Sequence, residues 1–389
     1  MTKKIFLGIA LMLILIVPTT SLSAHAATVP EEPGDTDNYA LNAAGATFPY
    51  PLIDKWRVEY NNAYPGITLN YQSIGSGAGI KLFTTQKVDF AASDAPLQTS
   101  DIQVAPKHTL HIPETMGAIV VVYNLPEFPK SGLKLTGKVI ADIYMGKIIT
   151  WNDPAIKKLN PEIKNLSRNK IILVHRSDGS GTTFAFTDYL SKVSPAWKGG
   201  VGQGTSVPWP AGVGGSGNAG IAAIVSKVPY SMGYVELAYA NQNYMVSTGT
   251  KIPMTYAFVQ NHDRTAFLNA TIDTTYAAAK VAIKNLPEST GVWSKVSIND
   301  APGPNSYPIS TFTYLLVNAD LDQIKGMDKQ KAQDLVHMLY WFITNGQQYS
   351  KKLLYVPLPD SVQELDKRGL AQIKFQGQQL FAYDNSSVS

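Results

Sequence analysis

Residues 171–184 read Ile-Ile-Leu-Val-His-Arg-Ser-Asp-Gly-Ser-Gly-Thr-Thr-Phe. The first four are apolar and mostly β-branched, as in a buried strand, and a loop of glycines and hydroxyl residues follows them. Phe186, Tyr189 and Leu190 then recur at helical spacing, so this part of the chain predicts a strand, a loop and a helix. Strands that alternate with helices in this way predict an α/β fold.

The loop in this stretch is suited to binding an anion. Glycines let the backbone approach a ligand closely, and the amide groups in the first turn of a helix have no partner within the helix. Arg176 adds a permanent positive charge, and Asp178 can hold its guanidinium group in place or face the ligand itself. A glycine-serine loop can also be only a helix cap, so the rest of the chain has to supply the other half of such a site.

The N-terminus has the features of a secretory signal peptide. Lys3 and Lys4 form a basic start, residues 5–17 are an apolar run too short to span a membrane comfortably, and residues 24–26 read Ala-His-Ala, an A-x-A cleavage signal. We expect residues 1–26 to be removed, so that the mature protein lies in the periplasm or outside the cell. A retained anchor helix is the alternative, which the shortness of the apolar run disfavours.

Composition excludes several kinds of site. The chain has no cysteine, which excludes disulfides, thiolate metal sites and a lipid-anchored cysteine. Removing the signal peptide lowers the count of Lys and Arg from 33 to 31, against 29 Asp and Glu, and there is no basic stripe. We therefore expect no nucleic-acid partner, and we expect a soluble monomer without a cofactor or metal. Residues 27–38 have the composition of a flexible leader.

Other polar side chains follow predicted strands in the same way. Thr47 and Phe48 lie between a strand and a helix, and Ser76 opens a second helix within Gly-Ser-Gly-Ala-Gly. Asp94 follows the strand expected at 88–92, at the carboxyl end where open α/β sheets bind ligands. Each has a plainer interpretation, because Thr47 can simply cap its helix and Asp94 can form an Asx turn.

The remaining pattern continues the alternation of strands and helices. Residues 199–220 are glycine-rich and lead into a helix, and residues 212–217 within them are expected to form a loop at the rim of a cleft. A chain of this length favours two lobes over a single core. Further strands are expected at 67–71, 118–123, 232–235 and 307–317, and further helices at 137–145, 151–159, 221–225, 265–285, 328–345 and 361–374.

With these loops identified, the chain resembles the family of phosphate-binding proteins that serve high-affinity phosphate ABC transporters. Four segments are similar to the ligand loops of that family: Gly45–Pro49, Ile74–Ser76, Phe90–Leu97 and Arg176–Thr182. Shorter similarities follow in the same order, so that the resemblance covers nearly the whole mature chain, at residues 151–153, 214–218, 233–235, 307–310 and 358–361.

The resemblance implies a two-lobed α/β fold of the type II periplasmic-binding-protein kind. Each lobe would be a mixed sheet flanked by helices, with the ligand in the cleft between the lobes. Lobe 1 would comprise residues 39–117 and 308–389, and lobe 2 would comprise residues 118–307. The ligand would be inorganic phosphate, the partners would be the membrane permease subunits of an ABC transporter, and the protein would not be an enzyme.

Carried over residue by residue, the resemblance implies a set of ligand residues in which Phe48 and Gly181 act through their backbone. Asp178 matches the acid that orients the arginine. The chain departs from the family in lacking a further serine in its second loop and a cysteine for a lipid anchor. The implied phosphate ligands are Thr47, Phe48, Ser76, Asp94, Arg176, Ser180, Gly181 and Thr182.

Asp94 is expected to give selectivity. An ionised carboxylate can only accept hydrogen bonds, so it favours phosphate, which keeps a proton near neutral pH, over sulfate, which does not. Arsenate is protonated similarly and should be discriminated less well.

Two alternatives stay open at this point. A secreted phosphatase or related hydrolase would need a nucleophile elbow, Gly-x-Ser-x-Gly, and Ser76, Ser180 and Ser216 each fail at one or both outer glycines. His175 could serve as a base beside the site. A binder of another oxyanion would share the architecture, and Asp94 together with the arginine favours phosphate among them.

Overall fold

The computed structural model describes residues 29–242, 244–245 and 251–383. The signal peptide expected at 1–26 lies outside the described residues. From Val29 on, the expected leader contacts helix α11, because Gln330 of that helix donates a hydrogen bond to Asp37 (3.0 Å).

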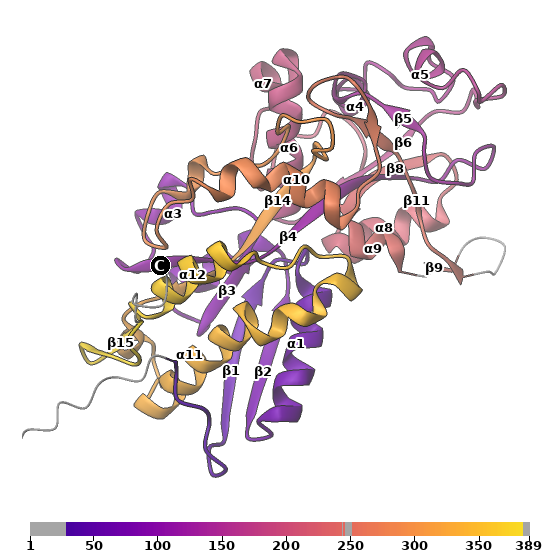
Figure 1. Ribbon diagram of the computed structural model, residues 1–389. Helices are drawn as coiled ribbons and strands as arrows, with labels where there is room; N and C mark the ends of the chain where they lie inside the picture. The colour runs from indigo at the N-terminus through magenta and orange to yellow at the C-terminus, as the bar shows by residue number, and fades with distance from the viewer. Residues whose placement is uncertain (1–28, 243, 246–250, 384–389) are drawn as a thin grey trace, which may run out of the picture.

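Within the described residues, nine strands form one sheet in the order β2-β1-β3-β14-β4-β8-β6-β7, and β11 is added beside β4 (Figure 1). The sheet is mixed, because β1 is parallel to β2 and β3, whereas β14 is antiparallel to both β3 and β4. The strands of this sheet are β1 Tyr39–Gly45, β2 Ile67–Ser73, β3 Phe90–Ser93, β4 Thr109–Tyr123, β6 Ile172–Arg176, β7 Val213–Gly215, β8 Ser231–Glu236, β11 Thr255–Tyr256 and β14 Ser310–Asn318.

The long strand β4 belongs to two groups of strands. Its residues from Thr109 to Ala118 pair with β14, and its residues from Ile119 to Tyr123 pair with β8. Figure 1 shows the consequence: β1, β2 and β3 lie in the lower half of the molecule, β6 and β8 lie in the upper half, and β4 passes from one to the other. Shorter pairings lie outside the sheet, made by β5 Lys134–Leu135, β9 Tyr244–Met245, β10 Lys251–Ile252, β12 Phe258–Gln260, β13 Phe267–Leu268, β15 Lys374–Phe375 and β16 Gln378–Gln379.

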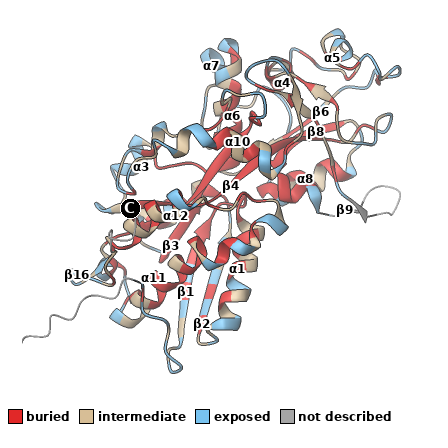
Figure 2. Ribbon diagram, viewed as in Figure 1, coloured by how far each residue is buried: buried red, intermediate tan, exposed pale blue. Residues whose placement is uncertain are grey.

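Helices cover both halves of the sheet, and none in the described part of the chain is both long enough and apolar enough to span a bilayer. Figure 2 shows buried strands at the centre and exposed residues on the outer faces of helices at the rim. The helices are α1 Tyr50–Ala63, α2 Ser76–Thr84, α3 Thr99–Ile102, α4 Gly137–Tyr144, α5 Pro154–Leu159, α6 Gly181–Val193, α7 Pro195–Gly200, α8 Gly217–Lys227, α9 Leu237–Asn241, α10 Ile272–Ile283, α11 Lys329–Ile343 and α12 Asp360–Leu370.

Helix α1 illustrates how the sequence sets its packing. A proline lies in its first turn, where no amide donor is needed, and Leu52, Trp56 and Tyr60 recur at helical spacing and are all buried. Trp56 stacks on Phe342 of α11 with 4.8 Å between the ring centroids. This packing ties the helix that follows β1 to the C-terminal part of the chain.

The α/β architecture is confirmed, but β4 is longer than expected. The strand expected at 118–123 is only its last part. Its earlier residues include His111 and Glu114, which are buried in the structure. Their polarity conceals the strand in the sequence, because a strand covered on both faces is normally recognised as a continuous apolar run.

Two further segments differ from the prediction. The helix expected at 265–285 begins only at Ile272, since β13 precedes it and the side chain of Thr271 accepts a hydrogen bond from the first turn. The rim loop expected at 212–217 contains β7, which pairs with β6, and the helix expected from Ile221 begins earlier, at Gly217. Strands of two or three residues are too short for their periodicity to be recognised.

Candidate functional site

The loops that follow five strands meet where the two halves of the sheet face each other. The carboxyl ends of parallel strands lie at one edge of a sheet, which brings together the loops after β1, β2 and β3. The loops after β6 and β7 come from the other half, and direct hydrogen bonds join the two halves. Thr182 donates a hydrogen bond to Oδ2 of Asp94 (3.1 Å), and the amide of Gly77 donates to the carbonyl of Gly179 (2.9 Å).

Arg176 is the positive centre of this site. Its side chain is 1% exposed, and its Nε donates to Oδ1 of Asp178 at 2.7 Å, while Nη2 is paired with the other carboxylate oxygen. Nη1 donates to the hydroxyl of Thr182 at 3.4 Å. Burial raises the pKa of Asp178, but the hydrogen bonds and the charge of Arg176 outweigh burial, so this pKa lies below its ordinary value. Asp178 is therefore ionised and holds the guanidinium in a fixed direction.

Asp94 is the acidic group of the site, and it is only 2% exposed. Burial raises its pKa to about 7, against the opposing charge of Arg176 and the hydrogen bonds from Thr182 and Thr313. The hydroxyl of Thr313 also lies within hydrogen-bonding distance of Oε1 of Glu114 (3.0 Å), a carboxyl whose pKa burial raises to about 8. Asp94 can thus gain or lose a proton near neutral pH within the folded protein.

Thr47 and Phe48 lie between β1 and α1, and their backbone is held by two tyrosines. Tyr239 donates to the carbonyl of Thr47 (2.7 Å), and Tyr355 donates to the carbonyl of Phe48 (2.6 Å). The hydroxyl of Thr47 does not cap α1, whose cap position is occupied by Pro49 without a side-chain hydrogen bond. The interpretation of Thr47 as a simple helix cap is therefore wrong.

Ser180, Gly181 and Ser76 lie where the two halves touch. Ser180 caps α6 by accepting from the amide of Thr183 (3.1 Å), as the sequence suggested. Ser76 begins α2, and its hydroxyl accepts from the amide of Asp94 (3.3 Å). A Cβ atom added at Gly181 would lie 2.6 Å from the hydroxyl oxygen of Ser76, so the halves approach this closely only with glycine at that position.

Asn218 is a site residue that the sequence analysis missed. It lies at the start of α8, is fully buried, and donates from Nδ2 to the hydroxyls of Thr47 (2.9 Å) and Thr182 (3.2 Å). The signal was available, because Gly-Ser-Gly-Asn at 215–218 repeats the glycine and hydroxyl pattern of the other ligand loops. Asn218 was not chosen because the preceding residues were expected to form a loop at the rim of the cleft, with no strand before that loop.

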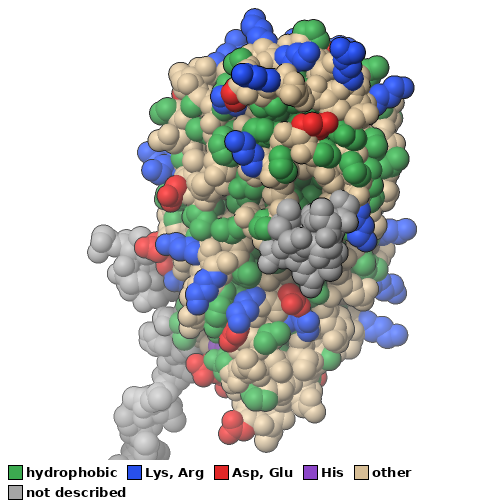
Figure 3. Space-filling view, turned by 90° about the vertical axis from the view of Figure 1, so that its right-hand side faces the viewer, with side chains coloured by type: hydrophobic (Ala, Val, Ile, Leu, Met, Phe, Trp, Pro, Cys, Tyr) green, Lys and Arg blue, Asp and Glu red, His purple; other side chains and the backbone are tan. Residues whose placement is uncertain are grey.

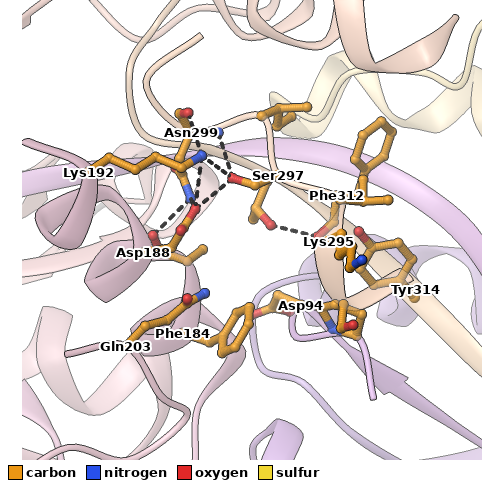
Figure 4. Close-up of a pocket in the computed structure, with 16 residues that line it drawn as sticks. Asp94, Phe184, Asp188, Lys192, Gln203, Lys295, Ser297, Asn299, Phe312 and Tyr314 are labelled. Carbon is orange, nitrogen blue, oxygen red and sulfur yellow. Dashed lines mark hydrogen bonds and ion pairs between the residues drawn. The ribbon is translucent and has the colours of Figure 1, made fainter. Parts of the chain in front are cut away.

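A polar cavity of about 270 Å³ adjoins Asp94 (Figure 4). Phe184 and Asp188 of α6 line one side, and Phe312 and Tyr314 of β14 line another. Lys192 crosses between α6 and the segment before β14, where its Nζ donates to the hydroxyl of Ser297 (2.6 Å) and the carbonyl of Asn299 (2.9 Å). These contacts are further links between distant parts of the chain beside the site.

The histidines lie in other surroundings. His108 is paired with Asp320, and His111 accepts from the amide of Leu97 (3.1 Å). His175 stacks on Trp209 with 5.0 Å between the ring centroids. Within residues 29–242 and 251–383, no group of three or more His, Asp or Glu side chains could hold a metal ion.

The face of the molecule in Figure 3 carries many Lys and Arg side chains. They are scattered among apolar and acidic side chains and do not form one continuous stripe. A basic stripe of the kind that follows a nucleic-acid backbone is therefore missing from this face of the described chain.

Two halves of one mixed sheet that bring buried hydroxyls, an arginine and a carboxylate to their junction define the class of two-lobed binding proteins. Comparison supports this class, since residues 23–329 match the PBP superfamily domain, PBP_like_2. A putative phosphate ABC transporter substrate-binding protein from Clostridium perfringens has a similar fold, with a TM-score of 0.56 at 16% identity. The match covers 82% of this chain and 100% of that one.

Sequence relatives define the family more closely. The chain is 39% identical to the phosphate-binding protein PstS of Pasteurella multocida, over 96% of this chain and 97% of the relative. It is 37% identical to PstS of Methanocaldococcus jannaschii, over 96% of each chain. The chain belongs to the PstS family of phosphate-binding proteins. This membership confirms the family resemblance, the periplasmic-binding-protein fold and the expectation that the chain is not an enzyme.

Proposed function

We propose that this protein binds inorganic phosphate in the periplasm or outside the cell and delivers it to the membrane permease subunits of an ABC-type phosphate transporter. Its relatives carry the name phosphate-binding protein, and the Clostridium perfringens relative of similar fold holds bound phosphate. The contact between Thr182 and Asp94 carries the proposal, because it joins the arginine loop of one half to the acceptor carboxylate of the other.

The ligand residues in this proposal are those that the family resemblance implied. The anion would meet the first-turn amides of α2 and α6, hydroxyl donors from both halves and the guanidinium of Arg176. Asp178 acts by orienting the guanidinium. The proposed ligands are Thr47, Phe48, Ser76, Asp94, Arg176, Ser180, Gly181 and Thr182.

Oriented donors must account for most of the binding. Arg176 contributes one positive charge, and Asp94 and Asp178 contribute two negative charges when both are ionised, so net charge does not favour an anion. Hydrogen bonds from buried, fixed donors are much stronger than in water, because they act in a region of low dielectric constant. Asp94 adds selectivity, since it needs a proton that phosphate carries and sulfate lacks.

Phosphate would stabilise a closed arrangement of two lobes, namely residues 39–117 with 308–389 and residues 118–307. Ligands come from both lobes, so the anion binds better when they are close, which is a population shift about a hinge. The change of partner along β4 between Ala118 and Ile119 supports a hinge beside this boundary. The closed form is the one that the permease would recognise, and the binding protein would act as a monomer.

Titration calorimetry of the mature protein with phosphate, sulfate and arsenate tests the proposal. We expect tight binding of phosphate, weaker binding of arsenate, and sulfate binding weaker by about 1,000-fold or more, because a buried carboxylate facing an unprotonated anion costs several kcal/mol. Failure to bind phosphate would refute the proposal.

A further inference from the structure

Asn218 holds one orientation at the junction of the two halves. The amide of Glu236 donates a hydrogen bond to the side-chain oxygen of Asn218 (3.0 Å). A backbone N–H can only donate, so the oxygen of Asn218 must face Glu236 and its NH₂ group must face the opposite way. The NH₂ group therefore points at the hydroxyls of Thr47 and Thr182, one hydrogen to each.

The hydroxyl of Thr47 is left with only one role. A hydroxyl has one hydrogen and can accept about two hydrogen bonds. Thr47 accepts from the backbone amide of Asn218 (3.1 Å) and from its Nδ2 (2.9 Å), which fills both acceptor positions. The hydrogen of Thr47 must then be donated to a further partner.

The hydroxyl of Thr182 is constrained in the same way. It accepts from Nδ2 of Asn218 (3.2 Å) and from Nη1 of Arg176 (3.4 Å). Its own hydrogen is donated, and in the structure Oδ2 of Asp94 receives it (3.1 Å). One asparagine thus determines the direction of two hydroxyls that come from opposite halves of the molecule.

We infer that Asn218 is a positioning residue that makes Thr47 and Thr182 obligatory donors to the bound anion. The inference rests on the proposed function, because it assumes that phosphate occupies this site. Fixed donor hydroxyls offer hydrogens to the bare oxygens of the anion and leave acceptance of its proton to Asp94. Without Asn218 each hydroxyl is free to turn and accept, so its hydrogen must be ordered again when the anion binds.

A double-mutant cycle on Thr47 and Asn218 tests this inference, with calorimetry of inorganic phosphate as the measurement. We expect Asn218→Ala to weaken binding about 10- to 100-fold, in line with the loss of oriented buried hydrogen bonds. We expect Thr47→Val, which removes the hydroxyl and keeps the shape, to weaken binding to a similar degree. The double variant should lose clearly less affinity than the product of the two single losses, because Asn218 acts in part through the hydroxyl of Thr47 and in part through that of Thr182.

The inference would be overturned if the loss of phosphate affinity in the double variant equalled the product of the two single losses, since Asn218 would then act only through packing. The same cycle with Thr182→Val repeats the test on the other hydroxyl. If Asn218→Ala does not fold, Asn218→Asp replaces it, because the aspartate has the same shape and draws the hydroxyl hydrogens away from the anion. In that background Thr47→Val should cost much less affinity than in the native protein.

Asn160 provides a matched control. It is buried and makes three side-chain hydrogen bonds, to the backbone of Lys134 and Ile156. Asn160→Ala should lower the melting temperature and leave phosphate affinity unchanged. If the native protein does not bind phosphate, the proposed function fails. If it binds phosphate, and Thr47→Val weakens binding but the changes at Thr47 and Asn218 multiply, only the inference about Asn218 fails.

Discussion

Compared with the half of the site that residues 176–182 provide in one continuous stretch, the facing half is assembled from three separate segments. These contribute Thr47, Ser76 and Asp94, which are brought together by the parallel pairing of β1, β2 and β3. The continuous half carries the guanidinium, and the assembled half carries the acceptor carboxylate. We therefore expect affinity to depend mainly on the continuous loop and the choice between anions to depend on the opposite half.

The largest effect is expected in the continuous half. Arg176→Met removes the buried positive charge and leaves Asp178 and Asp94 without it, so phosphate affinity should fall by about 1,000-fold or more. Titration calorimetry measures the loss. Arg57→Met is the control, because Arg57 forms an exposed ion pair on α1 and should leave affinity unchanged. Retained tight binding in the Arg176 variant would show that the assembled half suffices.

A change in the assembled half should affect selectivity more than affinity. Asp94→Asn replaces a pure acceptor by a side chain that can also donate, so sulfate becomes acceptable and the preference for phosphate should fall by about 100-fold or more. Competition between the two anions measures the preference. An unchanged ratio of affinities would remove Asp94 from this role.

The contact between the halves is tested at Gly181. Gly181→Ala places a Cβ atom 2.6 Å from the hydroxyl of Ser76, which prevents the halves from approaching fully, and phosphate affinity should fall about 10- to 100-fold. Small-angle scattering with phosphate should show incomplete closure. Gly199→Ala in α7 is the control, because a Cβ atom there meets nothing within 4 Å. Equal affinities in the two variants would contradict the proposed closure.

The smallest effect concerns pH in the phosphate-free protein. The pKa of Asp94 rises from 3.8 to about 7 on folding, so the folded state binds the proton more tightly than the unfolded state. The contribution of this proton to the free energy of unfolding is therefore lost as pH rises from about 4 to 7. Asp94→Asn lacks this loss, which amounts to about 4 kcal/mol, so its melting temperature should rise relative to the native protein by roughly 5 °C across that range. Melting curves without phosphate test this, and parallel curves would contradict it.

The continuous half of the site could be predicted from the sequence because its strand, loop and helix are neighbours along the chain. The junctions at Thr47, Ser76 and Asp94 were also visible, since each polar residue follows an apolar run. Each kept a plainer interpretation until the family resemblance joined them. Strand pairing determines which segments meet, and strand pairing cannot be predicted from any single segment.

Other parts of the site could not be predicted for the same reason. Tyr239 and Tyr355 hold the backbone of Thr47 and Phe48, but they lie far along the chain and have no local motif. The first part of β4 was missed because its buried polar residues break the apolar pattern. Their partners come from distant segments, as when the backbone carbonyl of Glu114 accepts from Gln347 (3.0 Å).

The shared strand β4 has a consequence for dissecting the molecule. Because consecutive parts of this one strand are hydrogen-bonded to different neighbours, neither half can be produced alone without uncovering a ladder of backbone donors and acceptors. Such an exposed edge strand pairs readily with other chains and leads to aggregation. The two halves should therefore unfold together, as one cooperative unit. Opening and closing of the molecule should bend this strand instead of separating two independent domains.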